Sequence, residues 1–178
     1  MKRILQATFL VAALLASTLM QAGPNEDLFI GIDLGDVSKI KQALNAGADV
    51  MSKNDFDQTA WTWAGLKGNQ TIINLLRQQK ELNTKLIKAI RAGNLAELQQ
   101  LLAAGVSANA VDSSYYDMPV LTRAISDGGR NTIDLVNALI KAGADVNAKD
   151  RSGRTALGYA QVHRRADIVN VLKAAGAK

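Results

Sequence analysis

The sequence predicts an all-α solenoid of about five helix-turn-helix repeats, and three observations lead to this prediction. Aromatic residues make up only 4% of the 178-residue chain, while Ala, Leu and Gly are frequent, which suits closely packed helices better than a β-sandwich. Two glycines able to end helices, Gly143 and Gly176, lie 33 residues apart. A large apolar residue followed three positions later by a small one recurs along the chain, as expected where helices approach closely.

One complete structural unit is visible between Leu139 and Lys178. It begins where Gly143 can adopt the left-handed conformation that ends a helix. The Asp and Asn residues from Asp145 to Gly153 tend to bond their own backbone in turns, which predicts a polar finger. Thr155 then stands where it can cap a short helix, and a second amphipathic helix follows until Gly176 ends it.

The same register recurs upstream of this unit. The pair Leu157 and Ala160 has four counterparts, which are Leu28 with Gly31, Trp61 with Ala64, Leu86 with Ala89, and Leu121 with Ala124. Four residues after each small residue a turn between two helices is predicted, at Gly35, Gly68, Gly93, Gly128 and Arg164. The positions that end the second helix of each repeat align at Gly47, Gln79, Gly105, Gly143 and Gly176.

Two repeats depart from the regular spacing. In the third, only 26 residues separate Gln79 from Gly105, so its finger is predicted to be truncated and to leave a notch in the concave rim. In the fourth, Gly128-Gly129 is the natural place for a longer loop between the two helices. The polar start of the first repeat and the basic residues of the last predict capping repeats, because terminal repeats need a polar outer face.

The segment T-A-L-G-Y-A, from Thr155 to Ala160, together with the 33-residue period, resembles the T-P-L-H-x-A signature of ankyrin repeats. The resemblance covers Asn25 to Lys178. It implies a stack of antiparallel helix pairs with projecting fingers, and a module that binds another protein through its fingertips and the adjoining short helices. The fold alone does not identify the partner.

Carried onto this sequence, the variable positions of the family lie on three fingers and the short helices beside them. The protein-binding residues that the resemblance implies are Asp55, Phe56 and Gln58, then Tyr115, Tyr116 and Met118, and finally Arg151, Ser152, Arg154 and His163. One partner bound on the concave face could meet several of them together.

The aromatic residues at the predicted fingertips allow two interpretations. Tyr and Arg are favoured anchors of protein interfaces, so Phe56, Tyr115 and Tyr116 are candidate contacts. Alternatively, the longer tips fold over the notch of the third repeat and fill it. Trp61 occupies the column of large residues and is interpreted as packing.

The inventory of reactive side chains argues against catalysis. A single histidine, His163, excludes sites that need two imidazoles, and the absence of cysteine leaves a structural zinc site without plausible ligands. Asp55 and Asp57 are interpreted as ordinary turn residues rather than an acid/base pair. The glycines around Gly47 and Gly143 end helices and do not form a phosphate loop. We therefore expect a non-enzyme without cofactor or metal.

The chain carries a net charge of +5, from 21 basic and 16 acidic residues. Two of the cations, Lys2 and Arg3, lie in the N-terminal segment described next, so the remainder carries +3. This excess is too small to indicate a nucleic-acid partner. The expected partner is a protein, and the free chain is expected to be a monomer.

Residues 1–22 have the pattern of a secretory signal peptide, with two cations, an apolar run and small or polar residues ending at Ala22. Cleavage there would leave residues 23–178 as the repeat domain. An uncleaved anchor is the alternative, but the apolar run is shorter than the ~20 residues of a spanning helix. We expect a periplasmic or secreted protein without stable membrane insertion after cleavage.

Some bacterial periplasmic ankyrin proteins are protective inhibitors of enzymes, including cell-wall peptidases. The resemblance therefore implies a module that binds a partner enzyme and holds it in check. A stress-related or scaffolding protein without inhibitory activity is the alternative.

Overall fold

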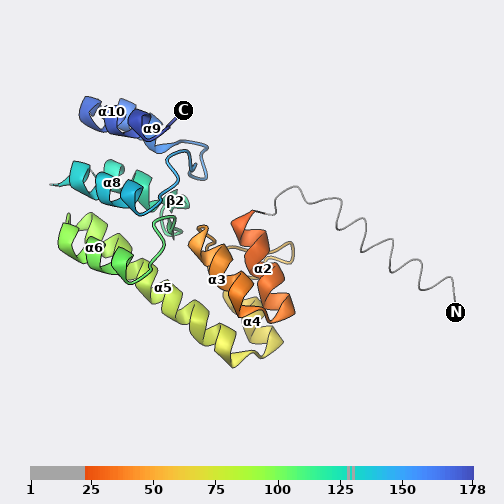
Figure 1. The fold of residues 1–178 in the computed structure, drawn as a ribbon. Coiled ribbons are helices and arrows are strands. Elements are labelled where there is room, and N and C mark those ends of the chain that lie inside the picture. Colours follow the sequence, from red (N-terminus) through yellow and green to blue (C-terminus); the bar gives the residue numbers. More distant parts are fainter. Residues whose placement is uncertain (1–22, 128, 130) are drawn as a thin grey trace, which may run out of the picture.

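The computed structural model describes residues 23–127, 129 and 131–178, so the predicted signal peptide and the predicted turn at Gly128 lie outside the described residues. The helices of the described part are α2 (Pro24–Leu34), α3 (Val37–Asn45), α4 (Ala60–Lys67), α5 (Gln70–Arg91), α6 (Leu95–Ala103), α7 (Val120–Ser126), α8 (Thr132–Lys141), α9 (Ala156–Val162) and α10 (Ala166–Ala174). They form antiparallel pairs stacked in sequence (Figure 1), which confirms the predicted fold class.

The predicted glycine stops fall where the helices end. Gly47, Gly105, Gly143 and Gly176 all adopt the left-handed backbone, with φ between 86° and 99°. Thr155 caps α9 as predicted, since its Oγ1 accepts a hydrogen bond from the Gly158 amide at 3.3 Å. Arg164 takes the place of the inter-helix glycine in the last repeat and has a φ of 55°. The turn therefore keeps its shape without the residue that favours it.

The exception among the stops is Gln79, where the chain does not turn. It lies inside α5, a continuous helix of 22 residues that joins the second helix of the second repeat to the first helix of the third. The shortening predicted for the third finger is therefore complete, because no turn separates the two helices. Since Gln is a good helix former and cannot enter the left-handed region as easily as Gly, nothing in the sequence stops the helix here.

The column of large and small residues is buried as its spacing predicts. Leu28, Leu86 and Leu121 are at most 1% exposed. Leu157 is 8% exposed, and the small partners Ala64, Ala89 and Ala160 are fully buried. Trp61 packs against the core as interpreted, but only in part.

The buried side chains form two clusters, one on each side of the middle of α5. The first runs from Leu28 to Leu76 and the second from Leu86 to Leu172. Within α5, no residue from Arg77 to Lys85 is buried. We call the helices on either side of this bridging segment the N-terminal block and the C-terminal block; α5 runs diagonally between them in Figure 1.

Three fingers project from the blocks, and each is named after its repeat. The fourth-repeat finger (residues 106–119) contains strands β1 (Val111–Asp112) and β2 (Met118–Pro119), which pair antiparallel. The second-repeat finger (48–59) is closed by a single bridge between Lys53 and Thr59, and the fifth-repeat finger (144–155) by one between Lys149 and Thr155.

The two blocks also meet at the bases of the second-repeat and fourth-repeat fingers. The Ser107 hydroxyl donates to the carbonyl of Asn45 at 2.8 Å. A Cβ built on Gly47 would lie 2.5 Å from the carbonyl oxygen of Asn109, so the backbones are too close there for any side chain. Loss of the third finger thus brings two fingers from non-consecutive repeats into direct contact.

Among the residues that the structure describes, no helix combines the length and the apolar character needed to cross a membrane.

Candidate protein-binding groove

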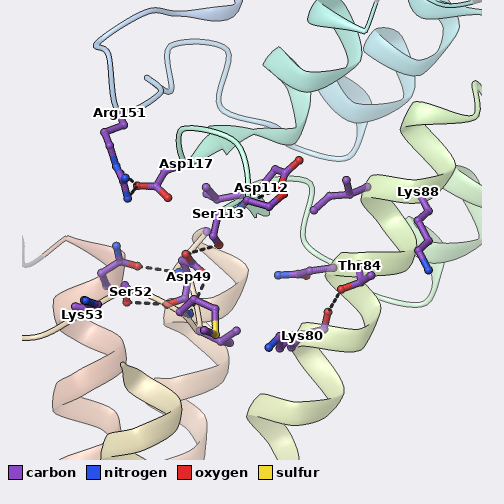
Figure 2. Close-up of a pocket in the computed structure, with 18 of the residues that line it drawn as sticks. Asp49, Ser52, Lys53, Lys80, Thr84, Lys88, Asp112, Ser113, Asp117 and Arg151 are labelled. Atoms are coloured by element: carbon purple, nitrogen blue, oxygen red, sulfur yellow. Dashed lines mark hydrogen bonds and ion pairs between the residues drawn. The ribbon is translucent and has the colours of Figure 1, made fainter. Parts of the chain in front are cut away.

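A groove of about 970 Å³ lies between α5 and the bases of the second-repeat and fourth-repeat fingers. Figure 2 shows Lys80, Thr84 and Lys88 on the α5 side, with Asp49 and Ser113 on the finger side. The groove lies where a third finger would otherwise stand, which is also where the sequence predicts a notch. We call it the notch groove.

The α5 wall of the notch groove is basic. Lys80, Lys88 and Arg91 line it and are exposed. Arg77 and Lys85, on the same helix, line a second cavity of about 500 Å³ that shares Met51, Lys80, Thr84 and Lys88 with the groove. Because residues three and four apart share one face of a helix, these five cations follow one side of α5. We call them the basic stripe.

The finger wall of the groove is organised by Asp49. One carboxylate oxygen accepts a hydrogen bond from the Met51 amide at 2.9 Å, and the other accepts one from the Ser113 hydroxyl at 2.6 Å. The Asp49 amide in turn donates to the side chain of Asn25 at 2.8 Å. Asp49 therefore connects the first helix, its own finger and the fourth-repeat finger.

Met51 lies where the regular fingers carry an asparagine. Asn109 and Asn147 stand at this position in the other fingers, and each donates its side-chain amide to the carbonyl of the next helix-ending glycine, Gly143 or Gly176. After the second-repeat finger there is no such glycine, because α5 does not stop. An asparagine would find no partner of this kind, and Met51 lines both cavities instead.

The notch groove carries an excess of positive charge. Its lining includes six cations, Lys53, Lys80, Lys88, Arg91, Lys149 and Arg151, and three carboxylates, Asp49, Asp112 and Asp117. Asp117 forms an ion pair with Arg151 at 2.6 Å, and Asp112 forms one with the buried Arg123 at 3.5 Å. Across the described part of the chain, Lys80, Lys88, Arg91 and Lys149 form no ion pair with a carboxylate.

The second cavity adds an aromatic wall. Trp61 lines it, and the Arg77 guanidinium lies 5.4 Å from the centre of the Trp61 ring. Glu81 is the acidic residue of its lining. An indole face beside cations suits a ligand that is partly apolar and partly anionic.

The predicted contacts Tyr115 and Tyr116 lie at the tip of the fourth-repeat finger and are 45% and 56% exposed. Their rings meet edge to face with centroids 5.3 Å apart, and the Arg123 guanidinium lies 4.7 Å from the Tyr115 ring. Neither tyrosine is among the residues that line the notch groove. The tips therefore do not fold over and fill the notch.

The fifth-repeat finger lies against the tip of the fourth. The Arg151 amide donates to the Tyr116 carbonyl at 2.9 Å, and the Arg151 guanidinium pairs with Asp117. This contact places Arg151 next to Tyr116, and the binding of one partner to both residues stays a prediction.

Ser152 and Arg154 contact a buried carboxylate, that of Asp150, and His163 lies against Tyr159, which also contacts it. Asp150 accepts hydrogen bonds from the Ser152 amide at 2.8 Å, from the Arg154 amide at 3.0 Å and from the Tyr159 hydroxyl at 2.8 Å. Burial raises the pKa of Asp150, but these hydrogen-bond donors and the charge of Arg154 together lower the pKa by more than burial raises it. The pKa therefore lies below its usual value of 3.8. The exposed His163 ring stacks on Tyr159 with centroids 6.4 Å apart.

The predicted contacts on the second-repeat finger are accessible but separate from the tyrosines. Phe56 is 77% exposed, and its amide and that of Gln58 both donate to the side chain of Asn54 at 3.0 Å. Asp55 is exposed beside it. Among the described contacts, none joins Phe56 to Tyr115 or Tyr116.

Met118 is a correction to the predicted contact surface. Its side chain is fully buried in the core of the C-terminal block. Met118 lies in β2 opposite Asp112, and the pleat turns its side chain inward, away from the exposed tip. It is therefore not available to a partner.

Sequence reasoning missed the basic stripe. The signal that could have found it is the lack of a glycine at Gln79 combined with an uninterrupted helical pattern from Gln70 to Arg91. Both point to a continuous helix, and a continuous helix would have placed the five cations along one side.

Within the described ranges, no three His, Asp or Glu side chains gather closely enough to hold a metal ion.

Comparison with known proteins identifies the repeats. The family described as ankyrin repeats (3 copies) matches residues 86–178, which is more than half of the chain. The match begins in the C-terminal half of α5, where the C-terminal block begins.

Three relatives share parts of the sequence. The 2-5A-dependent ribonuclease of Mus musculus is 36% identical over 75 residues, or 42% of this chain and 10% of that protein. The potassium channel KOR2 of Oryza sativa subsp. japonica is 29% identical over 203 aligned positions, or 89% of this chain and 27% of the channel. The mitochondrial disaggregase of Homo sapiens is 51% identical over 47 residues, or 26% of this chain and 7% of that protein.

The chain thus spans at most 27% of the length of these relatives. Proteins of this family bind protein partners. The helix pairs and the fingers of the structure have the architecture that the family match implies. The chain belongs to the ankyrin-repeat family.

Proposed function

We propose that this protein is exported to the periplasm or secreted, and that it binds a partner enzyme on its concave face and holds that enzyme in check. The observation that best supports binding is the open notch groove, which is bordered by two fingers and α5. Exposed aromatic residues at two fingertips provide anchors beside it. Residues 1–22 support export, since they have the pattern of a signal peptide.

In this proposal the protein has no catalytic activity of its own. Its single histidine, His163, is exposed and stacks on Tyr159, whose hydroxyl is engaged by Asp150. No nucleophile and base are paired around it in the described contacts. A His163→Ala variant should therefore have only a mild effect on the function, and complete loss of the function in a folded variant would point to an enzyme.

The test is affinity capture from periplasmic extract with the mature chain as bait, followed by an activity assay of the captured protein. The proposal expects one partner enzyme whose activity falls when the chain is added. A partner with unchanged activity would support the alternative, a scaffolding or stress-related protein. Absence of any captured protein, and retention of the chain in the cytoplasm in cell fractionation, would each contradict the proposal.

The tyrosine pair supplies a variant that separates binding from folding. Tyr115→Ala with Tyr116→Ala should weaken capture by about 2 kcal/mol or more if the rings are anchors, with little change in melting temperature, because both residues are about half exposed and lie outside the core. A double alanine variant of the exposed Gln99 and Gln100 on α6 is the matched control. A lowered melting temperature with intact capture would assign the tyrosines to packing.

A further inference from the structure

We propose that the notch groove binds an acidic segment of the partner protein, laid along α5 with its carboxylates against the basic stripe. This inference rests on the proposed function and adds the site and the chemistry of the bound segment. The acidic segment would occupy the space that the missing third finger leaves open.

The first argument is the exposure of the middle of α5. In the regular repeats a finger separates consecutive helix pairs, but α5 continues through this point without one. As a result, four helical turns from Arg77 to Arg91, about 21 Å long at 1.5 Å per residue, present one side to solvent. That side is basic, with five cations and one acid, Glu81, lining the two cavities.

The second argument is that these cations lack internal partners, whereas others in the same chain have them. Lys39 pairs with Asp27, and Lys67 pairs with Asp33, both at 2.7 Å. In the described part of the chain, none of the five cations of the basic stripe forms an ion pair with a carboxylate. Clustered like charges repel one another, so an acidic ligand would relieve the repulsion and gain attraction.

The third argument concerns the kind of acidic ligand. Met51 and Ile87 line the notch groove, and Trp61 lines the cavity that continues it. These apolar surfaces suit side chains that alternate with carboxylates along a polypeptide. Asp49 on the opposite wall can accept further hydrogen bonds, which suits a peptide because its backbone amides are donors, whereas a chain of phosphates offers none.

Fluorescence anisotropy with a labelled peptide of alternating Glu and Leu residues tests the inference. We expect binding that weakens with salt and weakens at least about tenfold in the double variant Lys80→Glu, Lys88→Glu, because each reversed charge now repels the peptide. The control Lys41→Glu, Lys141→Glu changes the net charge equally at exposed positions that line neither cavity, and should bind like the wild type. Melting temperatures of both variants check that they fold.

Several results would overturn the inference. Equal binding of the peptide by the groove variant and the control would mean that net charge, not the groove, attracts it. Equal binding of a Gln-Leu peptide would show that carboxylates are not recognised. Tighter binding of a single-stranded DNA oligonucleotide would assign the stripe to nucleic acid.

Capture of the natural partner separates this inference from the proposed function. If the groove variant captures the partner as well as the wild type does, while the tyrosine variant does not, the groove assignment is wrong and the protein-binding function stands. Loss of capture in the groove variant, with the Lys41 and Lys141 control intact, supports both. Absence of capture by the wild type contradicts the proposed function, and the peptide measurements then decide the groove assignment alone.

Discussion

The Ser113 hydroxyl donates a hydrogen bond of 2.6 Å to the Asp49 carboxylate, although the two residues are 64 positions apart. They belong to the fingers of the second and fourth repeats. In a regular array the third finger would stand between these two and keep them apart. Their contact closes one side of the notch groove. The integrity of the groove therefore depends on a few polar contacts as well as on the two apolar cores.

Substitution of Asp49 by Ala should lower the free energy of unfolding by about 1–3 kcal/mol, because it leaves the Met51 amide and the Ser113 hydroxyl without their acceptor. Ser113→Ala removes one of these hydrogen bonds and should cost about 0.5–1.5 kcal/mol. Chemical denaturation measures both. Asp55→Ala, on the exposed fingertip, is the control and should be neutral; an equal loss there would show that the Asp49 contacts are not special.

Gly47 and Gly105 form a matched pair for testing the close approach of the two blocks. Both have positive φ, 99° and 86°, but a Cβ on Gly105 meets nothing within 4 Å. Gly105→Ala should therefore cost only the left-handed strain of about 1–2 kcal/mol. Gly47→Ala adds a clash at 2.5 Å from the Asn109 carbonyl and should cost about 1–3 kcal/mol more.

Equal melting temperatures for the two glycine variants would contradict the contact between Gly47 and Asn109. The Gly47 variant should also bind the Glu-Leu peptide differently, since one wall of the groove would shift. The Gly105 variant should not.

Ala124→Leu should destabilise the C-terminal block by about 1–3 kcal/mol through overpacking. Ala124 is 2% exposed on α7, which contacts both α5 and α9. Thermal unfolding measures the effect, and Ala103→Leu at an exposed position of α6 is the size-matched control. An unchanged melting temperature for Ala124→Leu would mean that the small residue does not set the distance between helices.

Asp150 should make the stability depend on acid pH. Its pKa is lowered in the folded state, so the stabilisation is present above the unfolded value of 3.8 and is lost as the pH falls through the folded pKa. Asp150→Asn should therefore be less stable than the wild type at pH 7, and the difference should shrink as the pH falls below about 4. Urea unfolding at several pH values measures it.

Tyr159→Phe provides the second variant for this test. It removes one donor to the Asp150 carboxylate, so acid should destabilise the variant at a higher pH than the wild type. A difference between Asp150→Asn and the wild type that stays constant from pH 7 to pH 2 would contradict the assignment.

Much of this fold follows from local sequence signals. The spacing of Gly143 and Gly176, the cap at Thr155 and the column from Leu28 to Leu157 each depend on local geometry, and all lie where expected. The complete loss of the third finger was harder to predict, because the repeat register placed a stop at Gln79. The residue itself favours a helix, and the local preference overrode the register.

The candidate site was predictable only in part. Phe56, Tyr115 and Tyr116 are exposed because turn residues at fingertips have nothing to pack against. The inward direction of Met118 depends on the register of β1 and β2, which a one-residue shift would reverse. The alignment of Lys80 with Asp49 across the groove depends on tertiary contacts between non-consecutive repeats, for which the sequence contains no local signal.

The bridging segment of α5 also sets an angle. A helix turns by about 100° and rises 1.5 Å with each residue, so its length fixes both the separation and the relative rotation of the two blocks. One residue inserted between Arg77 and Lys85 would swing the C-terminal block by about 100° and part Ser113 from Asp49. Four inserted residues would nearly restore the angle while lengthening the helix by about 6 Å. Helical phase, counted in whole residues, thus decides whether the two fingers can meet.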